Sequence, residues 1–238
     1  MQNPDTQAPA PKKRTRLSPQ DREHLILTGA IEFVADHGFA FSTRELARHL
    51  NVSQSLLYRY FATKEEIIEK IYERVYVGRW NPEWDEILRD RQLSVQERLE
   101  RYLLDYSRVV LQKDWVRIFL LSAFEDPIIS QRYISMLRRR IFEPLLDEQL
   151  VSMGQKALSK PEDRELALEL IWGFHSSIFY LGVRQWIYKT PTQVNIETLV
   201  RSRTRSFLVG FESFLSDLNH RENGKAPPSA ITVNEGLE

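Results

Sequence analysis

The twenty residues STRELARHLNVSQSLLYRYF, numbered 42–61, contain two short apolar stripes at helical spacing. Leu46 and Leu50 belong to the first stripe, and residues 54–60 form a second short helix. Between them, Asn51 is one of the few residue types other than glycine that tolerate a left-handed backbone. The segment therefore predicts a helix, a tight turn and a second helix that is free to enter the DNA major groove.

Helix signals lie on both sides of this segment. Residues 18–21, Ser-Pro-Gln-Asp, predict a helix start, because serine caps a helix, proline fits its first turn and an acid suits its positive end. This helix should end at His37-Gly38. Thr63 should cap a further helix that runs to about Arg79, because Pro82 disfavours its continuation. We therefore expect residues 18–79 to form one helix-turn-helix DNA-binding domain.

In order and spacing, three blocks resemble the TetR family of transcription regulators: AIEFVADHGF at 30–39, the segment 42–61, and KEEI at 64–67. The resemblance covers about residues 18–75. Asn51 stands where the family commonly has glycine, and Ser55 where it has glycine or another small residue. Both suit the backbone but make the base preference harder to infer. The resemblance implies a regulator that binds double-stranded DNA, and by family habit a repressor that a small-molecule effector releases from a palindromic operator.

The resemblance also implies which residues contact DNA. Thr43 and Arg44 would lie against the phosphates at the start of the second helix, and Lys64 would lie near phosphate at the start of the fourth. Ser53 would cap the third helix so that its first N–H groups face the nucleic acid. The residues on the groove-facing side of the third helix, or contacting the DNA backbone beside it, would be Gln54, Ser55, Leu56, Tyr58, Arg59 and Tyr60.

The chemistry of these side chains suggests their roles. Gln54 can pair with adenine, Arg59 with guanine or a phosphate, and Leu56 can meet a thymine methyl group. Hydroxyl groups and Lys64 would position the protein without reading bases.

Two residue types in this stretch also suit the core. Tyr58 and Tyr60 are close enough in sequence that at least one of them could pack inward. We expect Leu57 to be buried, because it shares a helix face with Val52 and Phe61.

Basic residues gather at the N-terminal end. The whole chain is neutral, with 33 Lys and Arg against 33 Asp and Glu, but residues 10–64 carry nine basic and five acidic residues. A basic end on an acidic remainder is typical of phosphate binding with a separate regulatory body. Residues 1–17 lack apolar periodicity and are expected to form a disordered arm. Its cations would either contact the minor groove or phosphates, or only keep the chain soluble: Lys12, Lys13, Arg14 and Arg16.

The rest of the sequence is helical in pattern. Capping boxes at 94–97 and 159–162 open two helices, and Pro144 kinks or divides a third. No alternating strand pattern is present, so we expect an all-α fold with a C-terminal effector-binding and dimerisation domain at residues 80–218. Residues 219–238 should be disordered. The expected helices of this domain are 94–112, 114–124, 128–153, 159–188 and 195–218.

The last two helices carry long apolar stripes. The final helix is apolar or small at steps of three and four, and the helix before it is apolar on two sides. Packing within one chain could explain this pattern. The resemblance implies more, namely a homodimer held by a four-helix bundle from the last two helices of each chain. The expected interface residues are Leu170, Phe174, Leu181, Phe207, Phe211 and Phe214.

Between the DNA-binding domain and the last two helices, the resemblance implies an effector cavity. Aromatic side chains at helical spacing are usually core, and a buried His175 could simply bond to a neighbour. The aromatic character of the candidate lining residues suggests that the effector is a flat or apolar small molecule. We expect the cavity to be bordered by residues 63–79 and by the helices that carry Trp115 and His175. The candidate lining residues are Tyr106, Trp115, Phe119, Trp172, His175 and Phe179.

Several other classes of protein find no support. The chain has no cysteine, no glycine-rich phosphate loop and no clustered acid pair, so we expect no enzyme activity, no metal and no cofactor. The first ten residues have no apolar core of a secretory signal, and the longest uncharged apolar run, 170–183, is too short to span a membrane. These features predict a cytoplasmic protein. An architectural or interaction-type DNA-binding protein that needs no inducer is the alternative, and its body would be filled by side chains.

Overall fold

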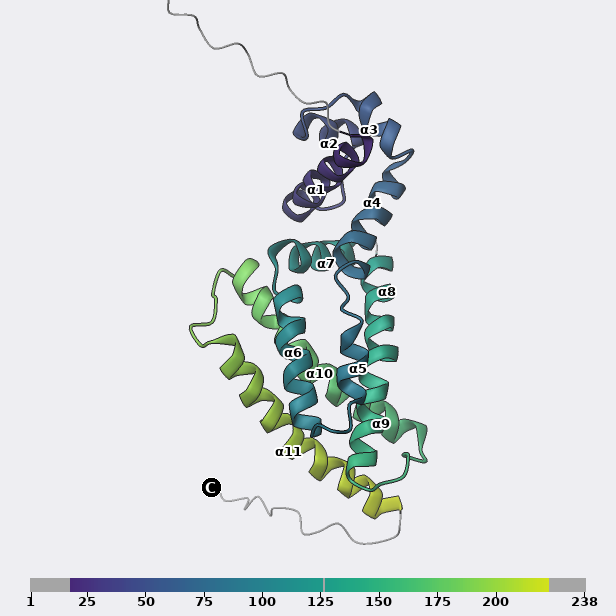
Figure 1. Cartoon of the computed structure of the whole chain (residues 1–238), viewed down its shortest axis with the longest axis vertical. Helices are drawn as coiled ribbons and strands as arrows, with labels where there is room; N and C mark the ends of the chain where they lie inside the picture. The colour runs from purple at the N-terminus through teal and green to yellow at the C-terminus, as the bar shows by residue number, and fades with distance from the viewer. Residues whose placement is uncertain (1–17, 126, 223–238) are drawn as a thin grey trace, which may run out of the picture.

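The computed structural model describes residues 18–125 and 127–222, and every regular element within these ranges is helical. The expectation of an all-α fold is therefore confirmed. Figure 1 shows a small helical unit at one end of a longer helical body. We call residues 18–79 the reading head and residues 80–222 the body.

The reading head contains α1 (Pro19–His37), α2 (Thr43–His49), α3 (Gln54–Tyr60) and α4 (Lys64–Tyr72), which continues into a wider π-helical turn, η1 (Glu73–Val77). A hydroxyl side chain caps each α-helix by accepting a backbone N–H, and Ser42 with Glu45 completes a capping box. Each such cap typically contributes about 1 kcal/mol. The capping residues are Ser18, Ser42, Ser53 and Thr63.

The turn between α2 and α3 has the expected conformation. Asn51 has a φ of 53°, in the left-handed region that asparagine tolerates. As predicted, Leu57 is fully buried, and it lies with Phe61 in the core of the reading head. Gly29 on α1 allows Leu50 to approach closely, because a Cβ at position 29 would lie 2.4 Å from the Leu50 side chain.

The body begins with a short helix that the sequence pattern did not predict, α5 (Glu83–Arg89). The Asn81 side chain accepts the Glu83 N–H at its start, and Trp84 is buried with its indole N–H donated to Asp105. Trp84 and Leu88 are its buried residues, and tertiary contacts such as the Trp84–Asp105 hydrogen bond hold this short helix in place.

The other helices follow the expected order with two corrections. The N-cap of α10 is Lys160, which makes no side-chain cap, so the helix begins one residue later than a cap at Ser159 predicts. The last helix continues through residue 222, so residues 219–222 are helical rather than part of a disordered tail. The elements are α6 (Val95–Val110), α7 (Lys113–Glu125), α8 (Ile128–Leu137), η2 (Arg138–Phe142), α9 (Glu143–Ser152), α10 (Pro161–Trp186) and α11 (Ile196–Glu222).

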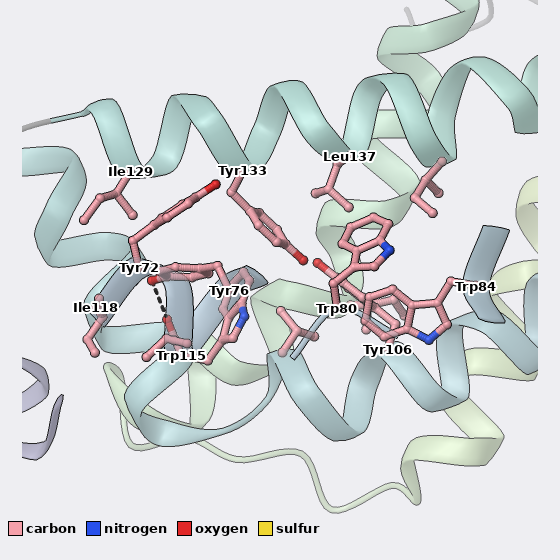
Figure 2. Close-up of a cluster of buried hydrophobic side chains, with 14 of the residues drawn as sticks. Tyr72, Tyr76, Trp80, Trp84, Tyr106, Trp115, Ile118, Ile129, Tyr133 and Leu137 are labelled. Atoms are coloured by element: carbon pink, nitrogen blue, oxygen red, sulfur yellow. Dashed lines mark hydrogen bonds between the residues drawn. The ribbon is translucent and has the colours of Figure 1, made fainter. Parts of the chain in front are cut away.

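Long helix α10 is the centre of the body. Its length and composition alone would allow it to cross a membrane. It packs instead against α6, α7, α9 and α11, and a helix that is apolar on two sides is expected where partners cover both. The aromatic core beside it, drawn in Figure 2, includes the buried rings of Trp84, Tyr106, Trp115 and Tyr133.

Candidate functional sites

The outer surface of α3 is polar. Gln54, Ser55 and Arg59 are exposed, and Tyr58 is 45% exposed. The Ser53 hydroxyl accepts the Leu56 N–H and lies 3.0 Å from the Ser55 hydroxyl. Leu56 and Tyr60, by contrast, are half-buried. This surface offers hydroxyl and amide groups at the start of α3 and the Arg59 guanidinium in its last turn.

Thr43 joins α2 to α3. Its hydroxyl accepts a hydrogen bond from Gln54 Nε2 at 3.0 Å and lies 2.8 Å from the Tyr58 hydroxyl. The Thr43 side chain is buried. It therefore holds two exposed side chains of α3 in place, which is a different task from the phosphate contact that the sequence suggested for it.

The cations of the reading head differ in how they are held. Arg44 is exposed. Arg59 lies over the Tyr60 ring, 5.4 Å from its centroid, and Lys64 donates to the Phe39 carbonyl at 2.6 Å. Lys64 thus bridges to the loop after α1 in this structure. The arm cations lie outside the described residues: Lys12, Lys13, Arg14 and Arg16.

The body contains a cavity of about 70 Å³ between α6, α7, α8, η2 and α10. Tyr133 and Phe142 also line it, and the sequence analysis missed both, because α8 and η2 reach the cavity only through the fold. No residue of α4 lines it, which corrects the expected border. Tyr76 of η1 instead packs on Trp115, with 5.2 Å between ring centroids. The structure brings together all of the predicted effector residues in this lining: Tyr106, Trp115, Phe119, Trp172, His175 and Phe179.

The polar groups of the cavity are neutral. Burial lowers the pKa of His175 to about 3, so the imidazole is uncharged at pH 7. Its Nε2 lies 2.8 Å from the Tyr102 hydroxyl. Burial raises the pKa of both Tyr106 and Tyr133 well above the usual range, so both hydroxyls are uncharged.

Helix α7 connects this cavity to the reading head. Trp115 and Phe119 line the cavity, whereas Arg117 donates to the carbonyls of Ala35 and Asp36 at the end of α1. Lys113 lies 2.8 Å from the Asp36 carboxylate and, mainly by hydrogen bonding, lowers the pKa of that group. Cations at the negative end of a helix are stabilising, so α7 fastens α1 to the body.

A second hollow, an open groove of about 840 Å³, lies along α10 and α11. Phe174 and Phe207 stack across it with 4.2 Å between centroids. Of the residues expected at a dimer interface, Leu170, Phe174, Phe207 and Phe211 line the groove.

The other two expected interface residues lie elsewhere. Phe214 is half-buried beside Phe211. Leu181, like the groove-lining Phe211, is only 3% exposed within its own chain, but unlike Phe211 it does not line the groove. The sequence pattern could not distinguish the inner from the outer apolar side of α10.

Comparison with known proteins finds a family match that lies within the reading head. Residues 26–71 match the family described as bacterial regulatory proteins, tetR family. A TetR-like regulator from Rhodococcus sp. RHA1 is 21% identical, covers 82% of this chain and 100% of its own, and has a TM-score of 0.60. AmtR from Mycobacterium smegmatis is 20% identical, covers 91% and 99%, and has a TM-score of 0.54. A regulator from Aquifex aeolicus is 23% identical, covers 79% and 97%, and has a TM-score of 0.52.

Proposed function

We propose that this chain, whose residues 26–71 match the tetR family of bacterial regulatory proteins, is a regulator of that family and acts as a homodimeric cytoplasmic repressor. It binds a palindromic operator through α3 and leaves it when a small molecule occupies the cavity of the body. The observation that carries this proposal is the exposed polar surface of α3, which Thr43 fastens to α2.

Gln54 and Arg59 read the bases, since both side chains are exposed and carry groups that pair with purine edges. Phosphate contact falls to Arg44, Tyr58 and the N–H groups at the start of α3. Further contacts with the DNA backbone come from Ser53, Ser55, Tyr60, Lys64 and the cations of residues 12–16. Leu56, which is half-buried, contributes an apolar contact.

The dimer forms along the groove of α10 and α11. Two reading helices must lie about 34–36 Å apart to enter successive major grooves, and a two-fold axis matches a palindromic site. The groove supports this arrangement because its floor is apolar and Gly173 and Gly210 have open space where a Cβ would stand.

Release requires that the ligand prefer a conformation with wrongly spaced reading helices. Helix α7 provides the physical link, because its cavity-lining rings and its contacts with α1 are on one rigid element. Arg79 adds a second connection by pairing with Asp114 at the start of α7.

One observation favours a second candidate, an architectural DNA-binding protein without an inducer. The cavity of about 70 Å³ is far smaller than the roughly 300–1,000 Å³ of typical ligand pockets. In that case the aromatic lining is core, and no small molecule should alter operator affinity.

Operator selection from random DNA, followed by affinity measurements on variants, tests the proposal. Arg59→Ala or Gln54→Ala should cost about 1–3 kcal/mol and relax preference at one position. Arg44→Ala or Lys64→Ala should weaken all sequences equally and lower the salt dependence by about one unit. The assignment is wrong if Arg44→Ala changes base preference while Arg59→Ala lowers affinity evenly.

A further inference from the structure

The chemistry of the cavity lining restricts what the cavity can bind. We propose that the cavity takes a small, uncharged aromatic molecule with one hydroxyl group, a phenol, which hydrogen-bonds to the Tyr106–Tyr133 pair. This rests on the effector function proposed above and adds the class of ligand to it.

Charge is the first property that the lining disfavours. Its residues are aromatic or aliphatic apart from His175 and Ser176, and none is Asp, Glu, Lys or Arg. His175 is neutral, because burial holds its pKa at about 3. A carboxylate or ammonium group would therefore lose its hydration without gaining a counter-ion, which is strongly unfavourable.

The buried hydroxyl groups favour a polar ligand over a hydrocarbon. Figure 2 shows the Tyr133 side chain reaching from α8 toward Tyr106, and both residues line the cavity. A tyrosine hydroxyl donates one hydrogen bond and accepts up to two, so these two hydroxyls have capacity for a ligand group. A ligand hydroxyl can serve as the donor or the acceptor that the two tyrosine hydroxyls require, because it can both donate and accept a hydrogen bond.

The walls favour a planar ring. Trp115 and Phe119 stack at 5.1 Å with 17° between their planes, and Phe179 meets them edge-on at 5.6 and 5.4 Å. A ligand ring can make the same stacked and edge contacts.

The size of the cavity favours a ligand with a single ring. The cavity of about 70 Å³ is smaller than the roughly 150 Å³ cavity that accepts benzene in an engineered protein. Entry must therefore displace side chains at the rim. Phe119, Trp172 and Phe179 are the lining rings that are partly exposed, and they border this opening.

Calorimetry on the full chain without DNA tests the proposal with 4-ethylphenol, ethylbenzene and 4-ethylbenzoate at pH 7, where the phenol is neutral. The phenol should bind about tenfold more tightly than ethylbenzene, which is roughly the contribution of one hydrogen bond. The benzoate should give no binding heat.

Variants identify the groups responsible. Tyr133→Phe should bring the phenol within about twofold of ethylbenzene while leaving ethylbenzene unchanged, and Tyr106→Phe provides a second test if that variant fails to fold. Tyr72→Phe is the matched control, because Tyr72 is buried but does not line the cavity. It should keep the full preference.

Equal affinity for the phenol and ethylbenzene, tighter binding of the benzoate, or no binding of any probe overturns the proposal. Operator affinity is measured separately. If the phenol binds as expected but does not weaken operator binding, the ligand class stands and the effector function fails. If a compound of another class releases the operator and the phenol does not bind, the effector function stands and the ligand class fails.

Discussion

The two hollows beside α10 differ in every property that selects a partner. The cavity is small and its lining is aromatic, aliphatic or neutral, including His175, whose Nε2 lies 2.8 Å from the Tyr102 hydroxyl. The groove is open and larger, and its lining includes Glu169, Arg203 and two glycines. Leu170 at its edge is 40% exposed, whereas His175 is buried.

This difference indicates the kind of partner that each hollow fits. A small aromatic cavity inside the body fits a small molecule. An open apolar groove with a charged rim resembles the surface that a protein interface covers. One helix thus carries two sites whose chemistry can be separated by substitution.

The largest expected effect comes from placing a charge in the groove. Phe207→Asp should convert the dimer to monomers, because a second copy would bury an unpaired carboxylate. Operator affinity should fall by at least about 100-fold, since one half-site is lost. Analytical ultracentrifugation and DNA titration measure the two effects.

Val209→Asp is the matched control for this variant. Val209 lies on the same helix, is 67% exposed and does not line the groove. It should remain dimeric with unchanged affinity. A folded Phe207→Asp dimer would place the interface elsewhere.

The next effect concerns the cavity and pH. The pKa of His175 is about 3 in the folded chain and near 6.5 in the unfolded chain, so below pH 6.5 only the unfolded chain gains this proton. The stability that depends on keeping His175 neutral is present above pH 6.5 and is lost as pH falls. Between pH 6.5 and pH 5 the loss should be about 2 kcal/mol, measured by urea unfolding.

His175→Gln should remove this part of the pH dependence while preserving a hydrogen-bonding group for Tyr102. His24→Gln, a change in the reading head, should keep the wild-type dependence. If the two variants have the same pH profile, the buried neutral histidine is not its cause.

The smallest effect concerns the connection through α7. Arg117→Ala removes hydrogen bonds to the end of α1, so ligand binding should weaken operator affinity several-fold less than in the unchanged chain, about 1 kcal/mol of coupling. Ligand affinity and dimerisation should not change. Arg108→Ala, an exposed position on α6, serves as the control. Full coupling in Arg117→Ala would assign the connection to α4 and η1 instead.

Sequence alone predicted most of the reading head, because its signals are local. Ser18, Ser53 and Thr63 cap helices that begin one residue later, and Leu57 is buried as its spacing requires. What escaped prediction there was the contact of Thr43 with Tyr58, since it joins two helices across the turn.

The body was harder to predict for the same reason. The aromatic residues of α7 and α10 were recognised as cavity candidates, but Tyr133 on α8 and Phe142 on η2 were not, because their place in the lining depends on how α8 and η2 pack in the fold. Leu181 shows the opposite error, because periodicity reports that a side is apolar but not which neighbour covers it. Register between distant helices depends on tertiary packing.

The placement of tryptophan has an experimental consequence. All five tryptophans, at 80, 84, 115, 172 and 186, are in the body, and the reading head has none. Trp115 and Trp172 line the cavity, while Trp186 is anchored to the Leu111 carbonyl at 2.7 Å. Tryptophan fluorescence therefore observes the body alone, so any change in tryptophan emission on adding operator DNA reports a change transmitted from the reading head to the body, without an attached dye.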